Sequence, residues 1–214
     1  MGFKTLAQTL LAAFILILTA NSQSIAQLTS EGDAGTAKRG YGDVLPGQDG
    51  TAPSTQGMTI IEAAQSGGVA EARGALLLGE SVNSRNARGK PALLFAAQAG
   101  NIAVMRFLLE KNANPDLIEK ATGKTALIAA AERGDSGMIH MLLEFKADPE
   151  HQDRQGETAL IKAARIGDPS SVSALLGAGL NVNATDYAGH TAYWHALDAR
   201  YDRIAKLIQN AGGT

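Results

Sequence analysis

The stretch that decides the fold runs from residue 123 to residue 155 and reads GKTALIAAAERGDSGMIHMLLEFKADPEHQDRQ. Its first part predicts a short apolar helix that begins after Thr125 and ends at Gly134, because glycine tolerates the left-handed conformation that stops a helix. Asp135 is placed to cap a second helix, whose apolar residues recur at helical spacing. A turn signal at Lys146-Ala147-Asp148-Pro149 follows, so the unit consists of two helices and a turn.

The same unit recurs along the chain. An alanine that begins an Ala-Ala or Ala-Leu pair returns at spacings of 33, 34, 33 and 33 residues, at Ala63, Ala96, Ala130, Ala163 and Ala196. A period near 33 with two short helices per unit is typical of a solenoid. We therefore expect an all-α stack of about five helix-turn-helix repeats at residues 57–88, 89–122, 123–155, 156–188 and 189–214.

These residues resemble the ankyrin repeat family. Gly123-Lys124-Thr125-Ala126-Leu127 and its three counterparts match the family's G-x-T-P-L opening, and Gly179-Leu180-Asn181-Val182-Asn183 matches its G-A-D-V-N turn. The resemblance covers about residues 57–214 and implies a solenoid with short β-hairpin-like turns between repeats. The chain departs from the family in lacking the proline after threonine and the following histidine, so we expect apolar contacts instead at Leu94, Ile128, Ile161 and Trp194.

The two terminal repeats differ from the inner ones. The second helix of the first repeat contains Gly74. Its apolar stripe, made of Val69, Ala72, Leu76 and Leu77, is out of phase with the apolar positions of the later repeats. Because a terminal repeat has only one neighbour, we interpret this degenerate unit as the N-terminal cap. In the last repeat Arg200 stands where the other repeats have glycine, which predicts a strained or differently shaped turn.

The N-terminus predicts export. Lys4 precedes an apolar run at residues 10–20, and Ser24-Ile25-Ala26 offers small residues for cleavage after Ala26. We expect residues 1–26 to be a signal peptide; the alternative, an uncleaved anchor, would need about 20 apolar residues to span a bilayer. Residues 27–56 are rich in Gly, Ser, Thr, Asp and Gln, which predicts a flexible, disordered linker. The chain has no cysteine, and the expected location is periplasmic or secreted, without stable membrane insertion.

The sequence offers little that is typical of an enzyme. Without cysteine there is no thiol catalysis, and no phosphate-binding glycine loop or Ser-His-Asp order is present. His190 and His195 are five residues apart, not the four that place two zinc ligands on one helical face, so we expect no metal and no cofactor. His195 could pair with Asp198 on the same helix, which leaves a small His/Asp-dependent enzyme as an alternative of a different class.

The resemblance to ankyrin repeats implies a protein-binding module. Its recognition positions are the turn tips and the end of each first helix. A formal net charge of −2 and charges of both signs at these positions favour a protein partner and exclude an extended nucleic acid. We expect a chain that is monomeric alone, with a hot spot at Arg165, Ile166 and Tyr187. The predicted partner-binding residues are Arg88, Lys90, Gln98, Lys124, Glu132, Arg133, Arg154, Gln155, Glu157, Arg165, Ile166, Tyr187, His190 and Asp198.

Three more specific roles stay open at this point. Resemblance to periplasmic ankyrin proteins of bacteria implies support or protection of another exported protein. A secreted effector that engages a host protein is the alternative within the same class. A structural spacer that presents the linker is a third reading.

Overall fold

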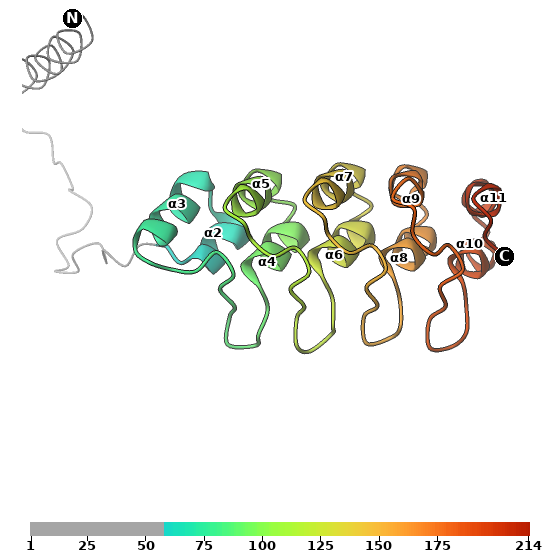
Figure 1. Ribbon diagram of the computed structural model, residues 1–214, viewed down its shortest axis with the longest axis horizontal. Helices are drawn as coiled ribbons and strands as arrows, with labels where there is room; N and C mark the ends of the chain where they lie inside the picture. Colours follow the sequence, from blue (N-terminus) through green and yellow to red (C-terminus); the bar gives the residue numbers. More distant parts are fainter. Residues whose placement is uncertain (1–57) are drawn as a thin grey trace, which may run out of the picture. The chain divides into compact units, whose positions relative to one another are not determined.

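The computed structural model describes residues 58–214 as a row of five helix pairs (Figure 1). The expected signal peptide and linker lie outside the described residues. One row contains the inner helices α2 (Ile60–Ser66), α4 (Ala92–Ala99), α6 (Ala126–Arg133), α8 (Ala159–Ile166) and α10 (Ala192–Asp198). The other contains the outer helices α3 (Val69–Leu77), α5 (Ile102–Glu110), α7 (Ser136–Glu144), α9 (Pro169–Leu176) and α11 (Asp202–Asn210).

Each inner helix packs against the inner helix of the next repeat and against the outer helix of its own. Residues 58–214 contain no strand, only the antiparallel bridges Arg85–Pro91 and Thr185–Thr191 at the bases of two connecting hairpins. The predicted all-α repeat solenoid is therefore confirmed. The hairpins project beyond the row of inner helices (Figure 1). None of the helices in this part of the chain is both long and apolar enough to cross a bilayer.

The helices begin and end where their capping residues place them. Thr125 and Asp135 accept hydrogen bonds from the backbone N–H groups of Ile128 and Met138, which satisfies donors that the first turn of a helix leaves free. Gly134 ends α6 with φ +67°, in the left-handed region that suits a residue without Cβ. The predicted caps of the third repeat are confirmed.

The core fills the space between the two rows of helices. Ala130 and Ala163 have no exposed surface, because the inner helices of neighbouring repeats approach each other at these small residues. The larger side chains of Leu127, Leu142 and Leu160 are also buried and close the space between inner and outer helices. The alanines that recur at the repeat period therefore belong to one core with these leucines.

Three predictions for positions outside this core have different outcomes. Leu77 was expected on the apolar stripe of α3, but it is 83% exposed and Ala75 is buried instead, so that prediction is wrong. Trp194, in the last described helix pair, is 42% exposed, whereas its counterparts Leu94, Ile128 and Ile161 are buried. Arg200 adopts φ +59°, which confirms the predicted strained turn.

A ladder of side-chain hydrogen bonds also ties each repeat to the next. The backbone N–H of Asp148 donates to the Asp116 carboxylate over 2.8 Å, and that of Asn114 donates to Asn83 over 2.9 Å. Two further bonds of the same kind join the third repeat to the fourth, and the fourth repeat to the C-terminal residue Thr214. Since each bond spans 31 or 32 residues of sequence, the ladder fixes the register between repeats.

Candidate functional site

The predicted partner-binding residues come from two parts of each repeat that contact one another: the connecting hairpin and the C-terminal end of the inner helix. We call the surface that they form the hairpin face. It comprises hairpin residues 85–91, 118–124, 152–157 and 185–190 together with the ends of α4, α6, α8 and α10.

A side-chain oxygen fixes the tip of three of the four hairpins. The Asp153 Oδ1 atom accepts hydrogen bonds from the backbone N–H groups of Gln155 and Glu157, over 2.9 and 3.0 Å. Asn86 and Asp186 do the same in the first and last hairpins. Because these turns satisfy the backbone locally, each hairpin presents its tip residues in a defined geometry.

Each tip residue also folds over a glycine of the hairpin before it. The Tyr187 ring occupies the space that a Cβ atom on Gly156 would need, and Gly156 has φ +77°. Both the missing side chain and the positive φ favour glycine there. The same arrangement places Lys120 over Gly89 and Arg154 over Gly123. The tips therefore form a continuous row of overlapping side chains along the stack.

Several predicted binding residues are paired with each other within their own repeat. Lys124 Nζ lies 2.7 Å from a Glu132 carboxylate oxygen, which joins the hairpin to the end of α6. Lys90 bonds to Gln98 and Glu157 to Arg165 in the same way, with the charges reversed in the second pair. These side chains connect the hairpin to the inner helix, so their polar groups are less available to a partner.

Glu157 differs from the expectation in its burial. It was expected at the surface, but it is only 4% exposed and its carboxylate bonds to Arg165 and to the buried Lys162. Lys162 Nζ also lies 2.9 Å from Asp153 and 3.5 Å from Glu132 of the preceding repeat. Glu157 therefore stabilises the hairpin face from inside instead of offering a free charge.

The charge of Lys162 depends on these partners. Burial opposes protonation, but the hydrogen bonds and charges of Glu157 and Asp153 outweigh it and raise the pKa of Lys162 above 10.5. Sequence reasoning missed Lys162 and Asp153. A signal was available, since Asp153 and Lys162 stand 33 residues before Asp186 and His195, in the same places of the repeat.

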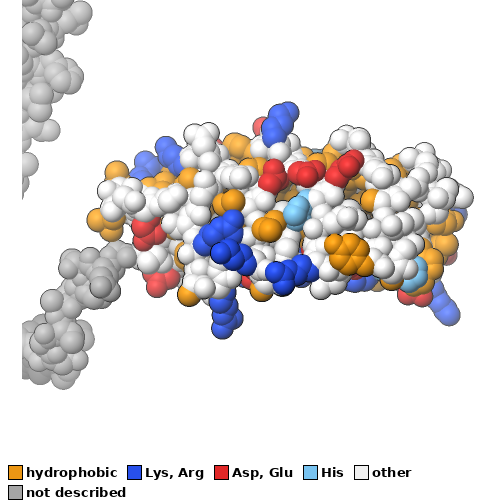
Figure 2. Space-filling view, turned by 60° about the horizontal axis from the view of Figure 1, so that its bottom comes forward, with side chains coloured by type: hydrophobic (Ala, Val, Ile, Leu, Met, Phe, Trp, Pro, Cys, Tyr) orange, Lys and Arg blue, Asp and Glu red, His pale blue; other side chains and the backbone are white. Residues whose placement is uncertain are grey.

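The predicted residues whose charges remain free on the hairpin face are mainly basic. Arg88, Arg133 and Arg154 are exposed, and none of them forms an ion pair within residues 58–214. Arg133 and Arg154 donate instead to backbone carbonyls of the repeat before them. Lys120, which the sequence analysis missed, extends the basic row, and Figure 2 shows Lys and Arg side chains gathered on this side. Asp198 is an exposed acidic residue of the predicted set.

The three residues of the predicted hot spot lie on two different elements. Ile166 is 47% exposed at the end of α8, beside Arg165, which bonds to Glu157. Tyr187 is 75% exposed at the tip of the next hairpin, where its N–H donates to the carbonyl of Gln155. Large apolar surface is therefore accessible at both places, and the hot spot stays a prediction.

The histidines are arranged differently from the expectation. His195 Nε2 lies 2.9 Å from the Asp186 carboxylate, so its partner is in the hairpin and the expected pairing with Asp198 is wrong. His190 belongs to the same hairpin, and its ring stacks on Trp194 with 3.6 Å between ring centroids. The Asp186 pKa lies below its usual value: burial opposes ionisation, but hydrogen bonds from the His190 N–H, the His195 ring and the Ala188 N–H outweigh it.

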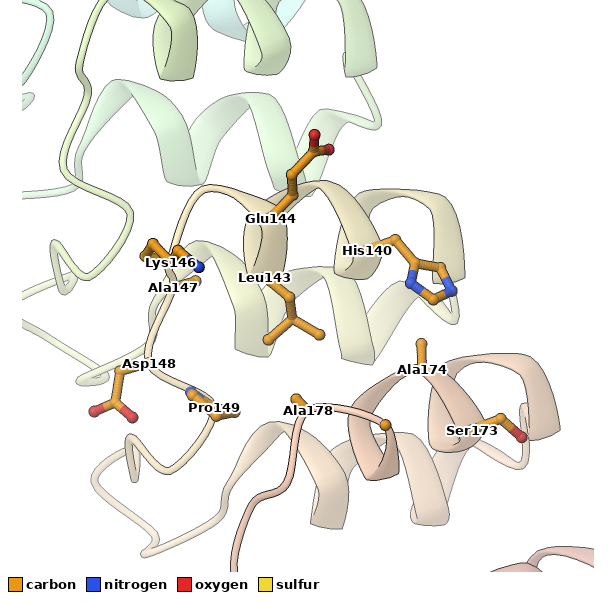
Figure 3. A pocket seen from close by; sticks show the side chains of 11 residues that line it. His140, Leu143, Glu144, Lys146, Ala147, Asp148, Pro149, Ser173, Ala174 and Ala178 are labelled. Carbon is orange, nitrogen blue, oxygen red and sulfur yellow. The ribbon is translucent and has the colours of Figure 1, made fainter.

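A groove of about 660 Å³ lies away from the predicted residues, between the outer helices α7 and α9 (Figure 3). Leu143 points into the space between the two helices, while Ala174, Gly177 and Ala178 on the α9 side are too small to fill it. His140 lies at its edge and is exposed. None of the predicted partner-binding residues lines this groove.

Comparison with known protein families gave a match that covers most of the chain. A family model described as ankyrin repeats (3 copies) matches residues 60–153 and 134–213. Comparison with curated proteins gave no match.

Proposed function

Because the chain belongs to the ankyrin repeat family, we propose that it is an exported module that binds an acidic surface of another protein with its hairpin face. Ankyrin repeats are protein–protein interaction modules and are generally not enzymes. The partner's charge and the place of export are the specific parts of the proposal.

The observation that carries the proposal is the way the charges are divided on the hairpin face. Glu132 and Glu157 are engaged by Lys124, Lys162 and Arg165, so their negative charges are balanced inside the protein. The free cations sit on the row of hairpin tips and at the end of α6. Complementary charge steers association and selects the partner, which favours a partner surface rich in Asp and Glu.

The exposed Tyr187 extends this row at its C-terminal end. A tyrosine buries a large area with little loss of side-chain freedom, and Tyr and Arg are enriched among residues that dominate binding energy. Tyr187 is held by its contact with Gly156 and is 75% exposed, so a partner can cover most of its ring. We therefore assign the row of tips from Arg88 to Tyr187 as the central part of the binding surface.

The proposed location rests on the N-terminal sequence. A basic residue, an apolar run and small residues before Ala26 favour a cleaved signal peptide, and the absence of cysteine is compatible with a bacterial periplasm. The partner is then an exported protein in the same compartment.

The proposal is tested by capture of partners from a periplasmic extract with the wild-type protein and with the double variant Arg88→Glu/Arg154→Glu. We expect one acidic protein that the wild type captures and the double variant does not. The control is Arg106→Glu, which makes at one exposed position of the outer helix α5 the same Arg-to-Glu change that the double variant makes at two positions. Circular dichroism of each variant checks that the fold is intact.

Two outcomes contradict the proposal. A partner that the double variant still captures does not use the row of tips. Equal loss in Arg106→Glu shows a response to overall charge and not to this face. A Tyr187→Ala variant then measures the contribution of the ring, which we expect to be at least about 2 kcal/mol for a residue that dominates binding energy.

A further inference from the structure

We propose that Asp186, His190 and His195 form a binding site for one divalent transition-metal ion of the Zn²⁺ class. Asp186 and His190 lie in the last hairpin, residues 185–190, and His195 lies on α10. The site lies within the hairpin face, but zinc binding there does not depend on the proposed protein-binding function. Sequence reasoning excluded it because it looked for two histidines on one helix, whereas His190 precedes the helix and the third ligand is a carboxylate.

The distances fit a metal ion after small adjustments. His195 Nε2 lies 2.9 Å and His190 Nδ1 lies 4.0 Å from Asp186 Oδ2, and all three donor atoms fall within 4.8 Å of one another. A tetrahedral zinc ion with bonds of about 2.0–2.1 Å places its ligand atoms about 3.3 Å apart. The observed separations from the carboxylate lie on either side of that value, so small rotations of the two rings bring the donors to the required positions.

The carboxylate is already oriented for this role. Its Oδ1 atom accepts hydrogen bonds from the backbone N–H groups of Ala188 and His190, each over 2.9 Å, which leaves Oδ2 directed at the imidazoles. Such contacts behind a metal ligand hold it in place and strengthen binding. The side chain of Asp186 is 8% exposed, so it is also largely shielded from water.

The two imidazoles are held by the only tryptophan of the chain. The His190 ring is stacked on Trp194, with an angle of 7° between the ring planes, and the His195 ring meets the indole edge-on over 5.1 Å. The His190 side chain is 36% exposed, which gives an ion access from solvent and leaves a position for a water ligand. His195 would bind the ion through Nε2 in the tautomer that carries its proton on Nδ1, because only a ring nitrogen with a free lone pair can bind a metal.

The nature of the donors selects the class of ion. Two imidazole nitrogens and one carboxylate oxygen suit Zn²⁺, Ni²⁺ and Cu²⁺, whereas Mg²⁺ and Ca²⁺ prefer sites made of oxygen ligands. Three protein ligands with an open fourth position give coordination typical of an accessible zinc site.

The preceding repeat supplies an independent argument. The equivalents of Asp186 and His195 are Asp153 and Lys162, and the Lys162 ammonium lies 2.9 Å from the Asp153 carboxylate. This corner of the repeat therefore holds a positive charge next to the hairpin carboxylate. Beside the last hairpin His195 takes the place of this lysine, and a bound divalent cation would supply a positive charge beside Asp186.

The test is titration of the purified full chain, carrying no polyhistidine tag, with zinc chloride, followed by calorimetry and by Trp194 fluorescence. We expect one equivalent of Zn²⁺ to bind with a change in fluorescence, and Mg²⁺ to give no response. His190→Ala and Asp186→Asn should each weaken zinc binding at least about tenfold. Asp186→Asn keeps the Oδ1 acceptor of the turn, and His140→Ala and His151→Ala are matched controls that remove a histidine elsewhere.

Two results would overturn the assignment. One is a wild-type protein that shows no saturable binding up to about 1 mM zinc, which means a binding free energy weaker than about 4 kcal/mol. The other is equal weakening in His140→Ala, which would indicate nonspecific surface binding. If His195→Ala proves unfolded by circular dichroism, His190→Ala decides the question, because the His190 ring is partly exposed and its removal leaves the turn bonds to Asp186 Oδ1 in place.

Discussion

Replacement of Lys162 by methionine should destabilise the protein strongly. The side chain of Lys162 is 4% exposed, and its ammonium lies among the carboxylates of Asp153, Glu157 and Glu132. Methionine fills a similar volume but carries no charge, so the change isolates the electrostatic contribution. Two of the three carboxylates are themselves buried, since 0% of the Asp153 side chain and 6% of the Glu157 side chain are exposed.

The expected magnitude follows from which bonds survive. Removing one partner from a buried ion pair costs about 3–5 kcal/mol, because the remaining charge stays buried without compensation. In Lys162→Met, Glu157 keeps its bond to Arg165, and Asp153 Oδ1 keeps its two backbone donors. We therefore expect a loss near the lower end, about 3 kcal/mol in the free energy of unfolding.

The raised pKa of Lys162 adds a pH dependence of known sign. A group whose pKa is higher in the folded state contributes stability that is complete below its unfolded pKa, here 10.5, and is lost as the pH rises through the folded value. The difference in stability between wild type and Lys162→Met should be constant near neutral pH. It should shrink as the pH rises above 10.5.

The assay is urea unfolding followed by far-UV circular dichroism, with a check for two-state behaviour because solenoids can unfold in parts. Lys124→Met is the matched control: its pair with Glu132 has side chains 22% and 27% exposed, so the loss should stay below about 1 kcal/mol. Asp153→Asn added to Lys162→Met should recover part of the loss, because asparagine keeps the Oδ1 acceptor without the charge. A Lys162→Met protein as stable as Lys124→Met would refute the reasoning.

Three further substitutions test the packing of the stack by urea or thermal unfolding. Ala163→Leu should cost about 1–3 kcal/mol because neighbouring inner helices leave no room at this buried position, and wild-type stability would contradict that close approach. Gly156→Ala should cost more stability than Gly189→Ala. Both glycines have positive φ, which costs a residue with a Cβ atom about 1–2 kcal/mol, but only at Gly156 would the added Cβ collide with Tyr187. Equal losses would count against a packing role for the Tyr187 ring. Arg200→Gly should stabilise by up to about 1 kcal/mol by relieving φ +59°, and a lower melting temperature would mean that the side chain of Arg200 contributes more than the strain costs.

Comparison of sequence and structure shows which features local patterns carry. The caps at Thr125 and Asp135 and the stop at Gly134 depend on residues at most three or four positions away, so they could be predicted. The exposure of Leu77 could not, because its surroundings depend on how the first helix pair meets its single neighbour. The same holds for Trp194, which is exposed although its counterparts in the earlier repeats are buried.

The sequence by itself determined the repeat, its period, the capping of its helices and the small residues along its core, since each is a property of one unit that recurs. The tertiary structure alone decided which charges are free. Glu157 and Arg88 are both charged hairpin residues, yet one is enclosed by Lys162 and Arg165 and the other faces solvent. Likewise, the His195 ring is hydrogen-bonded to Asp186, nine residues away, and not to Asp198 on its own helix. The physical reason is that an ion pair depends on the distance between two atoms and on their shielding from water, and both are set only when hairpins and helices are stacked in register.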